Sequence, residues 1–131
     1  MTTTFGIRKS LRATYDGALA LVAEALKSEG FGILTEIDVQ STLKQKLGVD
    51  FRRYKILGAC NPPLAHEALQ VELEVGLMLP CNVVVYEGDD GKAVVLAIDP
   101  TMTVAATGNA KLVELAGTVK QKLTRALAKL E

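Results

Sequence analysis

The sequence predicts an α+β fold with a mainly antiparallel sheet and two long helices packed on one face of it. Three observations indicate this class. β-forming segments alternate with helical segments, and the two most strongly β-forming runs, residues 81–86 and 92–98, are separated only by a short turn. The two longest helical patterns each carry one apolar stripe. Helices combined with a hairpin in this way are typical of α+β domains.

The chain begins with a predicted strand at residues 4–12, and the first long helix follows it. Thr14 can accept a hydrogen bond from the backbone at the helix start, and Asp16 is favourable in the first turn. Gly30 suits the left-handed position after the last turn. The apolar stripe between these signals consists of Leu19, Val22, Ala23 and Leu26.

Residues 31–39 alternate between apolar and more polar side chains, which predicts a second strand. Ser41 is predicted to cap a short helix that ends at Gly48. Leu43 and Leu47 are expected on the buried side of this helix.

A third strand is predicted at residues 51–59, and a second short helix follows it. Asn61 is a good helix cap, and Pro62 suits the first helical position because its missing N–H is not needed there. The apolar face of this helix is expected to consist of Leu64, Ala68 and Val71.

The C-terminal third is predicted to be a hairpin, a loop and the second long helix. The hairpin arms, residues 81–86 and 92–98, are nearly continuous in apolar residues, which favours central strands covered on both faces. Residues 99–108 are expected to form a loop, and Asn109 to cap the last helix. Gly117 inside that helix costs about 1 kcal/mol relative to Ala, and a close helix crossing would explain it.

The composition indicates one folded domain. The chain has 131 residues, of which 49% are hydrophobic and 23% charged. A chain of this length can bury a sizeable core without disulfides or metal. We therefore treat residues 1–131 as a single domain.

The charge balance disfavours nucleic acid as a partner. Fifteen Lys and Arg residues balance fifteen Asp and Glu residues, whereas phosphate-backbone binding depends on a cationic excess. We interpret the two basic clusters as solvated faces. They consist of Lys44, Lys46, Arg52, Arg53 and Lys55, and of Lys120, Lys122, Arg125 and Lys129.

The sequence also bears on the cellular compartment. The first residues lack a basic start and an apolar run, and no apolar run reaches the length of a membrane span. We therefore expect a cytoplasmic protein with no membrane partner. In a reducing compartment Cys60 and Cys81 are expected to be free thiols.

The stretch 58–66 is the most informative about chemistry. Cys60 precedes a predicted helix N-terminus, whose unpaired N–H groups and dipole favour a thiolate. The alternative is a buried, inert cysteine, because free cysteines are among the most buried residues. Cys81 begins a predicted strand and, like Cys60, is followed by asparagine. If the two cysteines are neighbours, they could form a redox pair, bind a soft metal or simply pack.

Other side chains could take part in a site. His66, the only histidine, could join Cys60 and Cys81 as a ligand of zinc or copper. Their spacing is not that of a recognised metal site, and an ordinary surface histidine is the alternative. Glu36 and Asp38 share one face of a strand and could bind a cation or transfer protons, but we interpret them as a solvated face.

No phosphate-binding loop, serine nucleophile or metalloprotease motif is present. The sequence therefore identifies no catalytic residue, metal or cofactor, and enzymatic activity is left open. Asn61 and Asn82 could offer hydrogen bonds to a small ligand or satisfy buried backbone groups. Polar and sulfur-bearing residues at element ends are typical of binding sites. The predicted ligand-binding residues are Cys60, Asn61, His66, Cys81 and Asn82.

Four strings of the sequence resemble one protein family. They are GFGILTEID at 30–38, LGACNPPLAH at 57–66, LPCNVVV at 79–85 and AIDP at 97–100. In this order, and across nearly the whole chain, they resemble the bacterial and archaeal family called domain of unknown function 302. The resemblance implies a TATA-binding-protein-like α+β fold, usually a dimer, and no established activity. Fold likeness to a DNA-binding protein does not imply DNA binding.

We therefore predict a homodimeric cytoplasmic protein that binds a small molecule near Cys60–His66 and Cys81–Asn82. A homodimer, the commonest oligomer of soluble proteins, would cover the second face of the sheet. The first alternative is a thiol-redox or soft-metal-binding protein that uses Cys60 and Cys81, with His66 as a further ligand. The second alternative is a structural or regulatory interaction domain.

Overall fold

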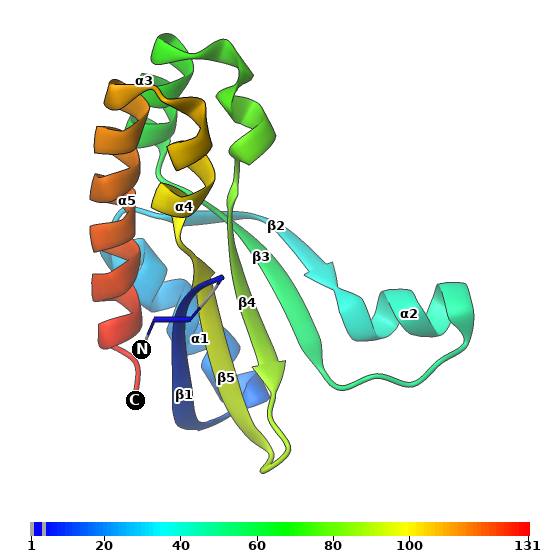
Figure 1. The fold of residues 1–131 in the computed structure, drawn as a ribbon. Coiled ribbons are helices and arrows are strands. Elements are labelled where there is room, and N and C mark those ends of the chain that lie inside the picture. Colours follow the sequence, from blue (N-terminus) through cyan, green and yellow to red (C-terminus); the bar gives the residue numbers. More distant parts are fainter. Residues whose placement is uncertain (1, 4) are drawn as a thin grey trace.

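The protein is built on a five-stranded sheet with strand order β1-β5-β4-β3-β2 (Figure 1). The computed structural model describes residues 2–3 and 5–131. The strands are β1 (Gly6–Thr14), β2 (Gly32–Asp38), β3 (Tyr54–Cys60), β4 (Cys81–Glu87) and β5 (Lys92–Ile98). The helices are α1 (Tyr15–Ser28), α2 (Val39–Leu47), α3 (Pro62–Val71), η1 (Leu73–Met78), α4 (Pro100–Val104), η2 (Ala105–Thr107) and α5 (Ala110–Ala128). Neighbouring strands pair antiparallel throughout the sheet, which confirms the predicted fold class.

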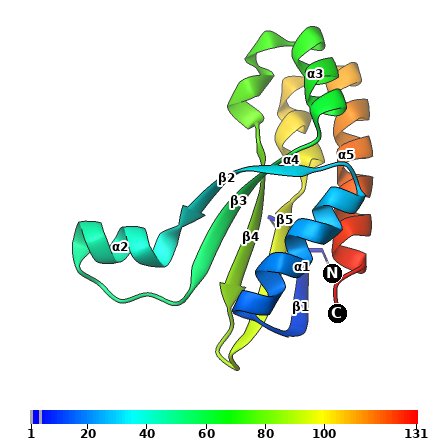
Figure 2. The ribbon, with the colours of Figure 1, turned by 180° about the vertical axis from the view of Figure 1, so that it is seen from behind.

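The two long helices, α1 and α5, pack against each other and against one face of the sheet (Figures 1 and 2). Their apolar stripes meet the inward-facing side chains of the strands, so this layer holds the main core. The largest side chains that it buries completely are Leu26, Leu57, Leu123 and Leu127, with Val22, Val83, Val85 and Val95. Burial of these stripes supplies the hydrophobic stabilisation of the fold.

A second, smaller core lies beyond the end of the sheet, where α3, η1, α4 and the first half of α5 come together at the top of Figure 1. Its buried members are Val75, Val104, Leu112 and Ala116. Partly buried Ala68, Leu69 and Leu79 pack against them. This upper tier, absent from the prediction except for α3 and α5, encloses the candidate site.

The opposite face of the sheet is less covered. Along β4, Cys81, Val83 and Val85 are buried, whereas Asn82 is exposed and Val84 is half-buried. Successive strand residues point to opposite faces, so the register identifies what we call the open face. It consists of Gly6, Arg8, Ser10, Thr35, Ile37, Tyr54, Ile56, Gly58, Asn82, Val84, Tyr86, Val94, Leu96 and Ile98. The hairpin strands were expected to be covered on both faces, but within one chain only the face that carries α1 and α5 is fully covered.

Residues 38–53, which we call the arm, carry α2 and stand away from the rest of the protein (Figures 1 and 2). Two expectations for this segment are wrong. The cap of α2 is Asp38, whose carboxylate accepts a hydrogen bond from the Ser41 backbone, and not Ser41. None of the residues of α2 is buried, and Leu47 is 68% exposed. The helix has the expected apolar side, but its own chain covers that side only in part: α2 contacts β2 and β3, and Leu43 is half-buried.

Most of the predicted helix caps are confirmed. The side chains of Thr14, Asn61 and Asn109 each accept a backbone hydrogen bond from the first turn of the helix that follows. Gly30 has a φ of 86°, in the left-handed region expected after α1. These features are local in sequence, so a sequence can specify them without knowledge of the tertiary fold.

Several details differ from the prediction. Residues 99–108 are not a loop but contain α4 and η2, because Asp99 caps a short helix that Pro100 begins. No close helix crossing explains Gly117, since nothing lies within 4 Å of where its Cβ would be. Val71 is exposed, although it was expected on the apolar face of α3.

Among the described residues, none of the helices is long and apolar enough to cross a membrane.

Candidate functional site

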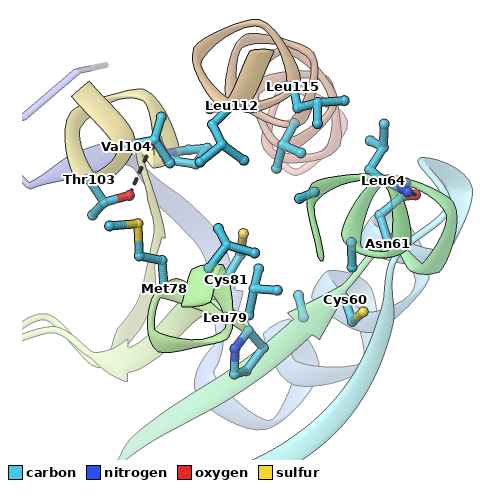
Figure 3. A pocket seen from close by; sticks show the side chains of 18 of the residues that line it. Cys60, Asn61, Leu64, Met78, Leu79, Cys81, Thr103, Val104, Leu112 and Leu115 are labelled. Carbon is cyan, nitrogen blue, oxygen red and sulfur yellow. Dashed lines mark hydrogen bonds between the residues drawn. The ribbon is translucent and has the colours of Figure 1, made fainter. Parts of the chain in front are cut away.

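The structure brings three of the five predicted site residues to one hollow. Cys60, Asn61 and Cys81 line a cavity of about 70 Å³ between the upper helices and the ends of β3 and β4 (Figure 3). We call it the apolar hollow. The side chains that complete it come from Phe31, Ala59, Leu64, Ala65, Ala68, Val75, Met78, Leu79, Pro80, Pro100, Thr103, Val104, Leu112, Leu115, Ala116 and Val119.

The lining of the apolar hollow offers mainly carbon and sulfur. The Thr103 hydroxyl donates a hydrogen bond of 2.9 Å to the Pro100 carbonyl, which is the dashed line in Figure 3. Within the part of the chain that the structure describes, no buried side-chain nitrogen or oxygen lacks a hydrogen-bond partner. The hollow therefore favours a group that needs van der Waals contact rather than hydrogen bonds.

The two cysteines lie at the same end of adjacent strands. Cys81 pairs with Ala59 in the β3–β4 register, and Cys60 is the next residue along β3. Because side chains alternate along a strand, the Cβ directions of Cys60 and Cys81 diverge, although both residues line the hollow. In Figure 3 the two sulfur atoms do not point toward one another. Both thiols are free, and diverging Cβ directions prevent a disulfide without movement of the backbone.

The Cys81 thiol is expected to be unreactive at neutral pH. Burial raises its pKa to about 11, and the neighbouring Cys60 adds to the increase. At neutral pH only about one Cys81 thiol in ten thousand is then ionised, and the thiolate is the form that attacks electrophiles or binds metal. Cys81 therefore contributes a small apolar wall to the hollow.

Asn61 is held by two backbone partners. Its carboxamide oxygen accepts a hydrogen bond from the Leu64 backbone N–H at the start of α3, and its nitrogen donates one of 3.3 Å to the Glu29 carbonyl at the end of α1. Gly30 leaves room for this side chain, because a Cβ there would lie 3.0 Å from Asn61 Nδ2. Asn61 thus joins two helix ends beside the hollow.

The remaining two predicted residues lie elsewhere. His66 is exposed on α3 and does not line the apolar hollow. Asn82 belongs to the open face, where it lines a separate depression with Tyr54, Val84 and Met102. A one-residue step along β4 therefore separates Asn82 from Cys81.

The basic clusters and acidic residues singled out in the sequence are largely engaged with each other. On and beside the arm, Lys44 pairs with Asp50, Arg52 with Asp89, and Lys55 with Glu36. On α5, Lys120 pairs with Asp99, and both Arg125 and Lys129 pair with Glu29. Among residues 2–3 and 5–131, no three His, Cys, Asp or Glu side chains come together as a metal site would require.

The wall of the hollow beside β3 depends on a glycine. A Cβ at Gly58 would lie 2.8 Å from Pro80 Cγ and would also collide with the Thr35 hydroxyl. Pro80 and Thr35 can lie against β3 because Gly58 has no side chain.

Sequence reasoning missed most of the lining of the hollow. Met78, Thr103 and Val104 come from η1 and α4, which were not predicted. Leu112 and Ala116 were assigned to the stripe of the last helix, and that stripe extends past the end of the sheet. The apolar stripe of α5 is longer than the sheet that it covers. That length could have indicated that other elements pack against the first half of the helix.

Comparisons with known proteins identify the family of this chain and a solved structure with the same fold. A family described as "Domain of unknown function DUF302" matches residues 7–130. The crystal structure of an uncharacterized conserved protein DUF302 from Bacillus stearothermophilus is 32% identical in sequence and superposes with a TM-score of 0.91. The match covers 98% of this chain and 100% of that one. No curated protein matches the chain.

Proposed function

This chain belongs to the family called domain of unknown function DUF302, and we propose that it is a homodimeric protein that binds a small apolar ligand in the hollow beside Cys60 and Cys81. The observation that carries the proposal is a carbon-lined cavity among described residues whose buried polar side chains are already hydrogen-bonded. Protein interiors are close-packed, with few voids larger than a water molecule.

The size of the hollow limits the ligand. At about 70 Å³ it is far below the roughly 300–1,000 Å³ of pockets that enclose a whole drug-sized molecule. It suits a compact hydrocarbon or aromatic group, or the apolar end of a longer molecule. The neutral Cys81 thiol and the sulfur of Met78 are polarisable contacts for such a group.

The homodimer is supported by the open face. Its central cross-strand row runs through Ile37, Ile56, Val84 and Leu96, and apolar area of this kind gains free energy when it is removed from water. The TATA-binding-protein-like class is part of the same proposal, supported by the antiparallel sheet with α1 and α5 on one face.

Other functions have less support. The diverging Cβ directions of Cys60 and Cys81, and the high pKa of the Cys81 thiol, count against a redox pair or a soft-metal site. The ion pairs of the basic clusters count against a nucleic-acid surface. Two free thiols are consistent with the cytoplasm as the compartment.

The test fills the hollow from one side. Ala116 is buried in its wall, so Ala116→Leu adds three carbon atoms there. The matched control is Ala128→Leu, on an exposed turn of the same helix. Xenon under pressure, and then alcohols from ethanol to pentanol, are titrated while methyl NMR signals of Val104, Leu112 and Leu115 are followed.

In the wild type and in Ala128→Leu these signals should shift and saturate, and the alcohols should show an optimum length. In Ala116→Leu the shifts should fall at least tenfold. Equal responses in all three proteins, or none in the wild type, would show that the hollow is not a binding site.

A further inference from the structure

We propose that the arm of one copy lies across the open face of a second copy, so that two chains exchange arms in a symmetric dimer. The inference rests on the homodimer of the proposed function and specifies which surfaces meet. It assigns a task to residues 38–53, which take no part in the apolar hollow.

The arm exposes apolar side chains that its own chain covers only in part. Leu47 is 68% exposed, and Val49 and Phe51 are each 43% exposed. Ile37, where β2 leads into the arm, is 50% exposed. Exposed apolar residues gathered on one projecting segment mark an interaction surface rather than chance exposure.

The arm is nevertheless an ordered shape. The Gln40 side-chain amide donates a hydrogen bond of 3.0 Å to the Phe51 carbonyl, and Lys44 Nζ lies 2.9 Å from an Asp50 carboxylate oxygen. Gly48 ends α2 with a φ of 66° and donates to the Lys44 carbonyl. Because these contacts lie within the arm and hold its shape, docking would lose little conformational entropy in the arm itself.

The open face has the composition of an interface centre. Its central row contains a single charged residue, Arg8, beside the four apolar ones. Next to that row, Tyr54 and Tyr86 stack with ring centroids 5.6 Å apart. Interface cores are depleted in charge and enriched in aromatic residues.

The open face alone is too small for a stable dimer interface, but the open face and the arm together are large enough. Three cross-strand rows of four or five residues make up the open face, fewer than the roughly 20–30 residues per side of a stable interface. The arm adds residues 38–53 and brings each side into that range. A chain with zero net charge does not repel its own copy.

In a two-fold symmetric dimer, the arm and the open face of one copy can contact the open face and the arm of the other. A two-fold axis presents the same patch from both chains, so the patch must be self-complementary. The Phe51 ring of the arm lies 6.1 Å, between ring centroids, from the Tyr54 ring of the open face, so the arm and the open face adjoin through aromatic side chains. Face against face, each arm then extends past its own sheet and over that of its partner.

The first experiment measures the dimer dissociation constant by sedimentation across a concentration series. Leu47→Glu places a charge on the arm at an exposed position, and Leu77→Glu does the same on η1, where Leu77 is 92% exposed. We expect Leu47→Glu to raise the dissociation constant by roughly 30-fold or more, as loss of a hot spot does. Leu77→Glu should leave it within about twofold of wild type.

The second experiment locates the arm. A nitroxide is attached at Lys46→Cys in an unlabelled chain that also carries Cys60→Ser and Cys81→Ala, and this chain is mixed with ¹⁵N-labelled wild type. Amide signals of Val84 and Leu96 in the labelled chain should broaden, because only the partner carries the nitroxide.

The outcomes separate the two proposals. A wild type that stays monomeric at all concentrations overturns both the homodimer and the arm exchange. A dimer that Leu47→Glu does not weaken, or whose broadened signals lie away from β4 and β5, overturns the arm exchange and leaves the homodimer standing.

Discussion

At the scale of single residues, two positions on β3 and β4 decide the character of the hollow. Gly58 makes room for Pro80, and the register that pairs Ala59 with Cys81 buries the Cys81 thiol. Neither effect requires a charged group. The character of the site thus depends on the missing side chain of Gly58 and on the Cys81 thiol, which stays protonated at neutral pH.

Gly58→Ala should destabilise the protein, because the new methyl group would press on Pro80 and Thr35. We expect a loss of about 1–3 kcal/mol in the free energy of unfolding, the usual cost of overpacking. Gly32→Ala is the matched control, since nothing lies within 4 Å of its Cβ position. That variant should be neutral or stabilised by up to about 1 kcal/mol. Urea unfolding measures both, and equal effects would contradict the close approach at Gly58.

Cys81 predicts a stability change in alkaline solution. Its folded pKa of about 11 lies above the ordinary value of 9.0, so the protonated thiol favours the folded state. This contribution is fully present below about pH 9 and is lost between pH 9 and 11, by about 2 kcal/mol. The decrease in unfolding free energy over that range should be smaller in Cys81→Ala than in wild type. Cys60→Ala should retain it, and parallel curves for all three proteins would refute the assignment.

At the scale of elements, Asp99 is the joint between the sheet and the upper tier. It follows the last residue of β5, accepts hydrogen bonds from the Thr101 backbone and hydroxyl, and pairs with Lys120 of α5 at 2.9 Å. Burial alone would raise the pKa of the Asp99 carboxyl, but the bonds from Thr101 and Lys120 outweigh it and hold the pKa below its ordinary value. One carboxylate therefore fixes α4 and α5 to the end of the sheet.

Asp99→Asn should reduce the acid sensitivity of the fold. Because the folded pKa is lowered, the stabilisation from the carboxylate is present above the ordinary value of 3.8 and is lost as the pH falls through the folded value. The variant should be less stable than wild type at pH 7, and the gap should narrow below pH 4. Thermal unfolding from pH 7 to pH 2 measures this, and a gap that is constant with pH would argue against the ion pair.

Local signals explain how much of the element pattern could be predicted. The caps at Thr14, Asn61 and Asn109 depend on side chains a few residues from the bonds that they make, and all three are confirmed. The helix α4 was missed because Asp99 and Pro100 suit a turn as well as a helix start. The burial assigned to α2 was wrong because an apolar stripe shows that a helix has an apolar side, but not how much of that side the rest of the chain covers.

At the scale of the whole molecule, the fold class could be predicted and the site only in part. Alternation and the hairpin were enough for an antiparallel sheet with helices. The site required the register between β3 and β4, which places Cys81 in the hollow and Asn82 on the open face. It also required η1 and α4, which supply Met78 and Val104. Neither the register nor these short helices has a clear signal in the sequence.

The strand order has a consequence for how the chain reaches this fold. Strands β2 to β5 pair with neighbours in sequence, but β1 pairs only with β5, so Ser10 must meet Val94 across most of the chain. Closing so long a segment slows folding more than it lowers stability. During synthesis, β1 therefore has no partner strand until β5 has left the ribosome. During that interval, a chaperone or a neighbouring nascent chain would bind this protein most readily.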